Sequence, residues 1–248
     1  TGTNIPANLK GVLSRPTVHS DCIESRDITA YVKNKIENPN RSHTVLAPAS
    51  SANLGPGFDS FGIAWQLYNE ITFDLDTERL SFEGCDTAYA NADNPAYRGF
   101  ALTLTENNIP IPPVKIIFGK TDIPVCRGLG SSSALTVAGI KAAASLYRLK
   151  LTKTQELALA TVIEGHPDNA GPVIYGGFTC SMTSDGTPYT VSFPIAEKLG
   201  FVALVPDREL STALARAALP KEIPHKDAVF NVSHAAVLIK ALETGDTE

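Results

Sequence analysis

The sequence predicts an α+β fold, because strand-like and helical stretches mix along the chain without strict alternation. Strand-like stretches at 44–47 and 70–75 are divided by Gly and Pro clusters. Two apolar stretches with helical character follow, at about 134–148 and 153–164. A doubly wound parallel sheet would require strands and helices to alternate regularly, so the mixed order favours α+β.

The remaining elements are expected on either side of this central part. Further strands are predicted at 177–182, 190–193 and 201–205, and two further helices at about 211–218 and 227–243. Residues 1–43 are polar and punctuated by proline, with one expected short helix around 27–37. We therefore interpret residues 1–43 as an N-terminal extension and expect the folded part to begin at Thr44.

Composition and charge argue against several classes of function. The 248-residue chain is long enough to bury a core, and its formal net charge of −5 provides no basic stripe for nucleic acid. No apolar run approaches the ~20 residues that span a bilayer. The 4 cysteines form no CxxC pair, which argues against a zinc site or a disulfide framework and favours a cytoplasmic location. The expected partner is a small molecule, and a homodimer stays an open option.

The stretch PVCRGLGSSSA, at 124–134, has the order expected of a phosphate-binding loop. A strand-like run ends, glycines turn the chain and three serines open an apolar helix. Gly128 and Gly130 let the backbone approach a ligand closely, while the free N–H groups of a helix beginning near Ser131 attract phosphate. The alternative is a glycine turn whose serines only cap the helix. The stretch is neither a Walker A motif nor a GxGxxG fingerprint.

Two further clusters gather polar side chains. APASSANLGPGFDSFG, at 47–62, presents the Asn53 amide and the Asp59 carboxylate among small residues, although an ordinary Pro/Gly surface loop is the alternative. EGHPDN, at 164–169, combines two acids, an imidazole and an amide. Glu164 suits Mg²⁺, which prefers one or two carboxylates beside phosphate oxygens. The alternative for this cluster is a helix C-terminus followed by a capping loop.

Taken in order, SSANLGPGFD, PxxxGLGSSSA and EGHPDN closely resemble the motifs of homoserine kinases, a family within the GHMP small-molecule kinase superfamily. The resemblance covers the chain from about residue 44 to its end. It implies ATP- and Mg²⁺-dependent phosphorylation of L-homoserine to O-phospho-L-homoserine in threonine biosynthesis. The alternatives are another GHMP small-molecule kinase, acting on mevalonate-like or sugar alcohols, and a non-catalytic, truncated nucleotide-binding remnant.

The resemblance also implies roles for individual residues. The ATP-binding loop would consist of Pro124, Val125, Cys126, Arg127, Gly128, Leu129, Gly130, Ser131, Ser132, Ser133 and Ala134. Ser132 and Glu164 would be the Mg²⁺ ligands. The homoserine pocket would be lined by Asn53, Asp59, His166, Thr212 and Arg216.

In that pocket Asp59 would suit the substrate ammonium group, and the Arg216 fork would suit its carboxylate. The candidate catalytic residues are Asn53, Asp59, His166, Asp168 and Arg216. Asp168 and Asp59 are the carboxylates to consider as a general base, but Asp168 could instead orient its neighbours. The identity of the base is therefore left open.

The implied architecture is the two-domain GHMP kinase fold. Residues 44–190 are expected to form the N-terminal ATP-binding domain, of a ribosomal-protein-like type, and 191–248 part of a ferredoxin-like C-terminal domain. Homoserine kinases normally continue for several tens of residues beyond the last segment of this chain. Those residues supply another carboxylate-binding arginine and a Gly/Ser-rich loop. On this resemblance the chain is expected to be C-terminally incomplete, with little or no kinase activity.

Overall fold

The computed structural model describes residues 39–205, 207, 215 and 217–246. In this part of the chain six strands form one sheet: β1 Ser42–Ala52, β2 Phe61–Asp74, β3 Ser81–Glu83, β4 Lys115–Thr121, β5 Phe178–Ser184 and β6 Thr187–Phe193. The helices are η1 Thr87–Tyr89, α3 Pro95–Glu106, α4 Ser131–Leu146, α5 Lys153–Glu164, α6 Ala170–Tyr175 and α8 His225–Thr244.

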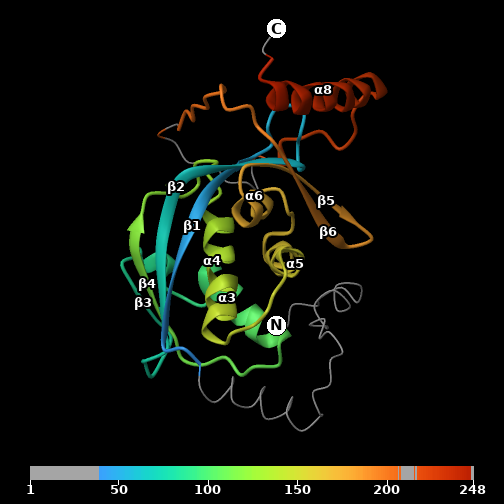
Figure 1. The fold of residues 1–248 in the computed structure, drawn as a ribbon. Coiled ribbons are helices and arrows are strands. Elements are labelled where there is room, and N and C mark those ends of the chain that lie inside the picture. The colour runs from blue at the N-terminus through green and yellow to red at the C-terminus, as the bar shows by residue number, and fades with distance from the viewer. Residues whose placement is uncertain (1–38, 206, 208–214, 216, 247–248) are drawn as a thin grey trace, which may run out of the picture.

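The sheet is mostly antiparallel, and the helices α3 to α6 lie together on one side of it (Figure 1). Its order is β3-β4-β2-β5-β6, with β1 paired to β2. The short pairing of β3 with β4 is parallel, whereas β2 runs antiparallel to β1, β4 and β5. A largely antiparallel sheet covered by helices on one face is an α+β arrangement, so the predicted fold class is confirmed.

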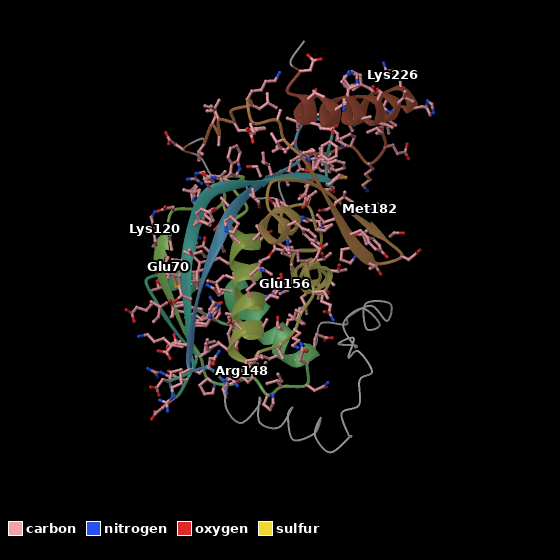
Figure 2. The ribbon with its side chains drawn as sticks, viewed as in Figure 1. Glu70, Lys120, Arg148, Glu156, Met182 and Lys226 are labelled. Atoms are coloured by element: carbon pink, nitrogen blue, oxygen red, sulfur yellow. The ribbon has the colours of Figure 1, made fainter. Side chains whose placement is uncertain are left out.

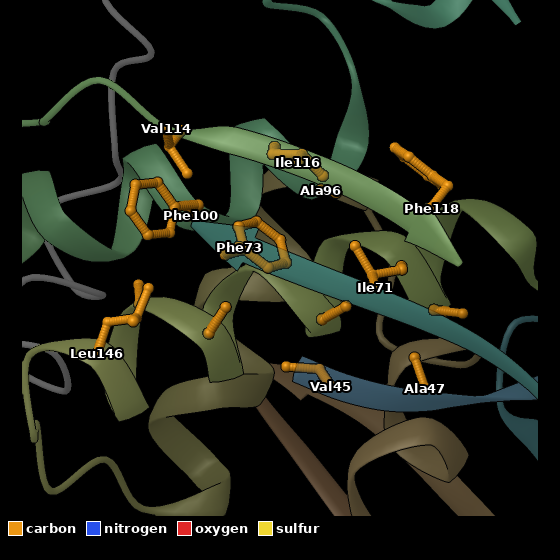
Figure 3. Close-up of a cluster of buried hydrophobic side chains, with 14 of the residues drawn as sticks. Val45, Ala47, Ile71, Phe73, Ala96, Phe100, Val114, Ile116, Phe118 and Leu146 are labelled. Atoms are coloured by element: carbon orange, nitrogen blue, oxygen red, sulfur yellow. The ribbon is translucent and has the colours of Figure 1, made fainter. Parts of the chain in front are cut away.

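The main core lies between the sheet and the helices α3 and α4 (Figure 3). Alternate residues of β2 are buried there, among them Ile71 and Phe73, because successive side chains of a strand point to opposite faces. The rings of Phe73 and Phe100 stack with their centroids 5.6 Å apart. This contact joins the centre of the sheet to α3.

Two glycines bring the backbones of α3 and α4 into close contact. A β-carbon built on Gly139 would lie 2.0 Å from the carbonyl oxygen of Ala96, and one on Gly99 would lie 2.2 Å from that of Thr136. Either would overlap the neighbouring helix. The absence of a side chain at both positions therefore sets how closely α4 can approach α3.

A partly buried ion pair joins α4 to α5. Lys141 Nζ donates a hydrogen bond to Glu156 Oε2 at 2.8 Å, and Figure 2 places Glu156 in the middle of the helical layer. α5 begins at Lys153 because Thr152 and Gln155 form a capping box. These contacts fix the axis of α5, whose last residue is Glu164.

The helices expected from periodicity are largely confirmed. The predicted helix 153–164 matches α5, the helix 134–148 begins three residues earlier as α4, and the helix 227–243 is α8. α3 was not predicted, although Asn94-Pro95 is a recognisable start: the Asn94 side chain accepts a hydrogen bond from the Ala96 N–H. The expected helix at 27–37 lies outside the described residues, as does most of that at 211–218.

The strand expected at 201–205 is wrong. This segment has no regular secondary structure, and Val202 and Leu204 are 85% and 91% exposed. Apolar, β-branched residues favour a strand only where a neighbouring strand accepts their backbone hydrogen bonds, and no described strand pairs with this segment. The other predicted strands exist and are mostly longer than expected.

α8 lies at one end of the molecule, apart from the layer of α3 to α6 (Figure 1). It is held by the hydrogen bond from the Ala196 N–H to the Leu242 carbonyl, and Leu238 reaches towards Gly55. In the described part of the chain, no helix combines the length and hydropathy needed to cross a membrane. The division into domains at 44–190 and 191–248 stays a prediction.

Candidate functional site

The glycine-serine loop leads from β4 into the N-terminus of α4. The N-cap of α4 is Gly130, in the left-handed conformation with φ 64°, and no described side chain caps the first turn. The N–H groups that open a helix have no partner within it, and together with the helix dipole they attract anions. The three serines are therefore not the caps that the alternative interpretation required.

Gly130 lies in a tight space as well as in an unusual conformation. A β-carbon at this position would lie 2.1 Å from Ser50 Oγ and 3.1 Å from Asn169 Oδ1. Ser50 comes from β1 and Asn169 from the EGHPDN run, so three separate segments meet at this glycine. At Gly128, by contrast, φ is 72° and a β-carbon would meet nothing within 4 Å.

Glu164, the last residue of α5, faces the first turns of α4. Its carboxylate accepts hydrogen bonds from Ser132 Oγ at 3.0 Å, Ser133 Oγ at 2.9 Å and Thr136 Oγ1 at 2.8 Å. The pairing of Ser132 with Glu164 was expected, and the structure brings the two together. Thr136 was missed, although its position four residues after Ser132 on one helix was a usable signal.

This group of side chains fits a divalent cation bound together with a nucleotide. Ser132 is exposed, and the Glu164 carboxylate is only partly buried at the edge of the phosphate-binding loop. Mg²⁺ keeps several waters and takes one or two carboxylates plus phosphate oxygens, so few protein ligands are needed. In residues 39–205, 207, 215 and 217–246, no group of three or more His, Cys, Asp or Glu residues could hold a metal ion alone.

In the EGHPDN run, a buried carboxylate is joined to a histidine. Asp168 is fully buried, and its Oδ1 contacts His166 Nδ1 and accepts a hydrogen bond from the Asn169 N–H at 2.9 Å. Its Oδ2 is also buried and has no hydrogen-bond partner in the described part of the chain. Because Nδ1 of His166 is held by Asp168, the imidazole ring has a defined orientation.

The SSANLGPGFD loop is closed by its own polar residues. Asn53 and Asp59 both have positive φ, at 60° and 54°, and the Asp59 N–H donates to Asn53 Oδ1 at 2.8 Å. Asn and Asp adopt this conformation more readily than most residues. The Asn53 oxygen therefore shapes the loop, and the Asp59 carboxylate is the charged group that this loop contributes.

Two side-chain hydrogen bonds tie this loop to the other two motifs. Ser50 Oγ donates to Asn169 Oδ1 at 3.1 Å, and Ser51 Oγ donates to the Gly128 carbonyl at 3.1 Å. Ser51 Oγ in turn accepts from Trp65 Nε1 at 2.9 Å. The motifs are far apart in sequence, yet they form one site.

Among the remaining predicted site residues, Leu129, Ser131 and Ala134 are buried, and the Arg127 guanidinium donates to the Asp207 carbonyl at 3.0 Å. Thr212 and Arg216 lie outside the described residues. Pro124, Val125 and Cys126 form the outer part of the loop, where Cys126 is exposed at φ 56°. Neither Ser50 nor Asn169 was predicted to have a role of its own, because side chains that pair across 119 positions leave no local signal.

Comparison with known proteins shows a consistent relationship. A model of the GHMP kinase N-terminal domain matches residues 94–177. A homoserine kinase of Clostridium botulinum (strain Loch Maree) is 43% identical over 82% of this chain and 68% of its own length. That of Clostridium beijerinckii is 38% identical over 83% of this chain and 69% of its own length.

Solved structures agree with this relationship. A homoserine kinase structure from Listeria monocytogenes is 34% identical, with a TM-score of 0.65 over 82% of this chain and 69% of that one. The homoserine kinase of Cytophaga hutchinsonii is 29% identical, with a TM-score of 0.70 over 84% of this chain and 69% of that one. The phosphomevalonate kinase of Streptococcus pneumoniae, 12% identical with a TM-score of 0.62, shares the fold.

Proposed function

The chain belongs to the homoserine kinase family of GHMP kinases, and we propose that it transfers the γ-phosphoryl group of ATP to the side-chain hydroxyl of L-homoserine. The products would be ADP and O-phospho-L-homoserine, a step of threonine biosynthesis. The observation that carries this proposal is the meeting of the three motifs, where Ser50 contacts Asn169 and Ser51 contacts Gly128.

The phosphate groups of ATP would bind along residues 124–134. The backbone N–H groups that open α4 are directed out of the helix N-terminus, and the positive end of the helix dipole favours their negative charge. Ser132 and Glu164 would hold Mg²⁺, which neutralises charge on the phosphate oxygens when it is bound. The protein's own part is to fix the γ-phosphate next to the loop that contains Asn53 and Asp59.

Homoserine would bind between this phosphate site and the SSANLGPGFD loop. The Asp59 carboxylate suits its ammonium group, and the Asn53 amide and the His166 ring would add hydrogen bonds. Thr212 and Arg216 would complete the recognition of its carboxylate. The Asn169 amide, between Ser50 and Gly130, lies where the two substrates would meet and could position the acceptor hydroxyl.

Asp168 is proposed to orient His166 and not to accept the substrate proton. It is fully buried, and its Oδ1 is engaged by His166 and by the Asn169 N–H. Phosphoryl transfer through a loose transition state requires positioning and charge neutralisation more than strong proton abstraction. A general base among the described residues is therefore not required by this proposal.

The proposal is tested by measuring binding and turnover on the same preparation. ATP affinity is measured by calorimetry, and phosphorylation rates are compared for L-homoserine, mevalonate and 1,4-butanediol. We expect ATP to bind and homoserine to be the preferred acceptor, even where the absolute rate of phosphorylation is low. Faster turnover of mevalonate would favour another GHMP kinase activity, and ATP binding without turnover of any acceptor would favour the non-catalytic alternative. A failure to bind ATP would refute the assignment of the phosphate loop.

We also infer a cytoplasmic location. Cys85, Cys126 and Cys180 are free thiols in the described part of the chain, and a reducing compartment keeps thiols in that state. Fractionation of cells that express the chain, followed by detection in each fraction, tests this location directly.

A further inference from the structure

The carboxylate of Glu164 is surrounded by hydroxyl groups of unequal exposure. Ser132 is exposed and can reach a ligand, whereas Ser133 and Thr136 are 2% and 0% exposed. Each of the three donates a hydrogen bond to this one carboxylate. The two buried hydroxyls therefore contact Glu164 inside the protein, whereas Ser132 contacts it where the helix end is exposed.

Thr136 departs from the behaviour of three other helical threonines. Thr103, Thr105 and Thr161 each donate to the carbonyl four residues earlier in their own helix, at 2.7 to 2.9 Å. This back-bonding is the usual arrangement for a hydroxyl in a helix. Thr136 instead turns its hydroxyl to Glu164, on a different helix and 28 positions away.

We propose that Thr136 and Ser133 are positioning residues that hold the Glu164 carboxylate in the orientation in which it binds the divalent cation of the nucleotide. The inference rests on the proposed role of Glu164 as a ligand of that cation. A glutamate side chain that is ordered only on binding loses up to about 2 kcal/mol of rotamer freedom. Hydrogen bonds formed beforehand remove much of that cost from the binding step.

The arrangement also leaves room for the cation. Ser132 and Thr136 donate to Oε1, and Ser133 donates to Oε2. When Ser132 exchanges this hydrogen bond for the cation, each carboxylate oxygen keeps one buried donor. A carboxylate has about four acceptor positions, so both oxygens can still bind a ligand.

The test compares Thr136→Val with a matched control, Thr103→Val. Both replace a fully buried helical threonine by a residue of similar shape, but Thr103 donates only to the Gly99 carbonyl in its own helix. Mn²⁺ binding in the presence of ATP is measured by electron paramagnetic resonance. ATP affinity in excess chelator is measured by calorimetry, and stability by thermal unfolding.

We expect Thr136→Val to weaken Mn²⁺ binding about tenfold, as for the loss of one hydrogen bond to a charged group, and to leave metal-free ATP affinity unchanged. Thr103→Val should retain the parental Mn²⁺ affinity even where its stability falls. Thr136→Ser keeps the hydroxyl and should behave as the parent does. Ser133→Ala, which removes the only donor to Oε2 among the described residues, is the second variant if Thr136→Val does not fold.

Glu164→Gln separates this inference from the proposed function. If Glu164→Gln binds Mn²⁺ as the parent does, the cation role of Glu164 is wrong and the positioning role falls with it. If Glu164→Gln weakens binding while Thr136→Val and Ser133→Ala do not, only the positioning role is overturned. Equal losses in Thr136→Val and Thr103→Val would also overturn it, because they would indicate a general effect on packing.

Discussion

Replacement of Gly130 by alanine tests whether the meeting point of the three motifs supports the phosphate site. The new β-carbon would lie 2.1 Å from Ser50 Oγ, 2.8 Å from the Ser50 carbonyl oxygen and 3.1 Å from Asn169 Oδ1. Ordinary van der Waals contact needs about 3.4 Å or more, so the loop and β1 must separate by roughly 1 Å. That movement would break the hydrogen bond between Ser50 and Asn169.

The size of the effect follows from two contributions. Alanine in the left-handed conformation costs about 1–2 kcal/mol, and forcing an extra group into a packed site costs about 1–3 kcal/mol more. Gly128→Ala provides the matched control, because Gly128 has φ 72° and a β-carbon there would meet nothing within 4 Å. Gly128→Ala therefore has the cost of the left-handed conformation without the cost of overpacking.

The assay is thermal unfolding of the two variants and the parent without nucleotide, followed by ATP titration in a calorimeter. For a chain of this size, 1 kcal/mol changes Tm by about 2–4 °C. We expect Gly130→Ala to unfold several degrees below Gly128→Ala and to bind ATP at least about tenfold more weakly than the parent. Equal unfolding temperatures for the two variants, together with parental ATP affinity in Gly130→Ala, would refute the reasoning.

Three further outcomes are expected. Asp59→Asn should weaken homoserine binding about tenfold in calorimetry with a non-hydrolysable ATP analogue, by loss of the partner for the ammonium group; an unchanged affinity would remove Asp59 from the pocket. Burial raises the pKa of the Cys180 thiol, which lowers its thiolate fraction at a given pH. At pH 8, iodoacetamide should therefore modify the exposed Cys126 before Cys180, and ATP should slow the modification of Cys126. Peptide mapping by mass spectrometry measures the modification rates of Cys126 and Cys180 with and without ATP. If ATP does not change the rate at Cys126, the assignment of this residue to the nucleotide-binding loop is contradicted. Gly139→Ala should lower the free energy of unfolding in urea by about 1–3 kcal/mol, because its β-carbon would lie 2.0 Å from the Ala96 carbonyl. In an unobstructed helix the same change stabilises the protein by about 1 kcal/mol. A stabilised Gly139→Ala variant would therefore contradict the close approach of α4 to α3.

Much of the helical structure could be predicted because its signals are local. The capping box of Thr152 and Gln155 lies within four residues of the start of α5, and Gly165 ends that helix in the left-handed conformation. The glycines before α4 likewise indicated the anion-binding end of a helix. In such cases a few neighbouring residues determine the conformation, so a single sequence is sufficient.

The rest depended on contacts between distant parts of the chain. The pairing of Ser50 with Asn169 arises from the packing of the sheet against the helices, and no local pattern indicates it. The helical spacing from Ser132 places Thr136 on the same face of α4, but it does not identify Glu164 as its partner. At 201–205 a strand was predicted that the structure does not contain. The segment has the composition of a strand, but no described strand pairs with it. Strand formation is a property of a pair of segments, which composition alone does not reveal.

The hydrogen bond from Trp65 to Ser51 gives the molecule an optical reporter of its own. The chain has 1 tryptophan, so its indole emission comes from a single, known position. That indole N–H donates to the hydroxyl that itself donates to the Gly128 carbonyl of the phosphate-binding loop. A nucleotide that shifts this loop changes the polarity and hydrogen bonding around the ring, and with them the intensity and wavelength of its fluorescence. Occupancy of the loop can thus be followed in solution without a label, at protein concentrations far below those that calorimetry requires.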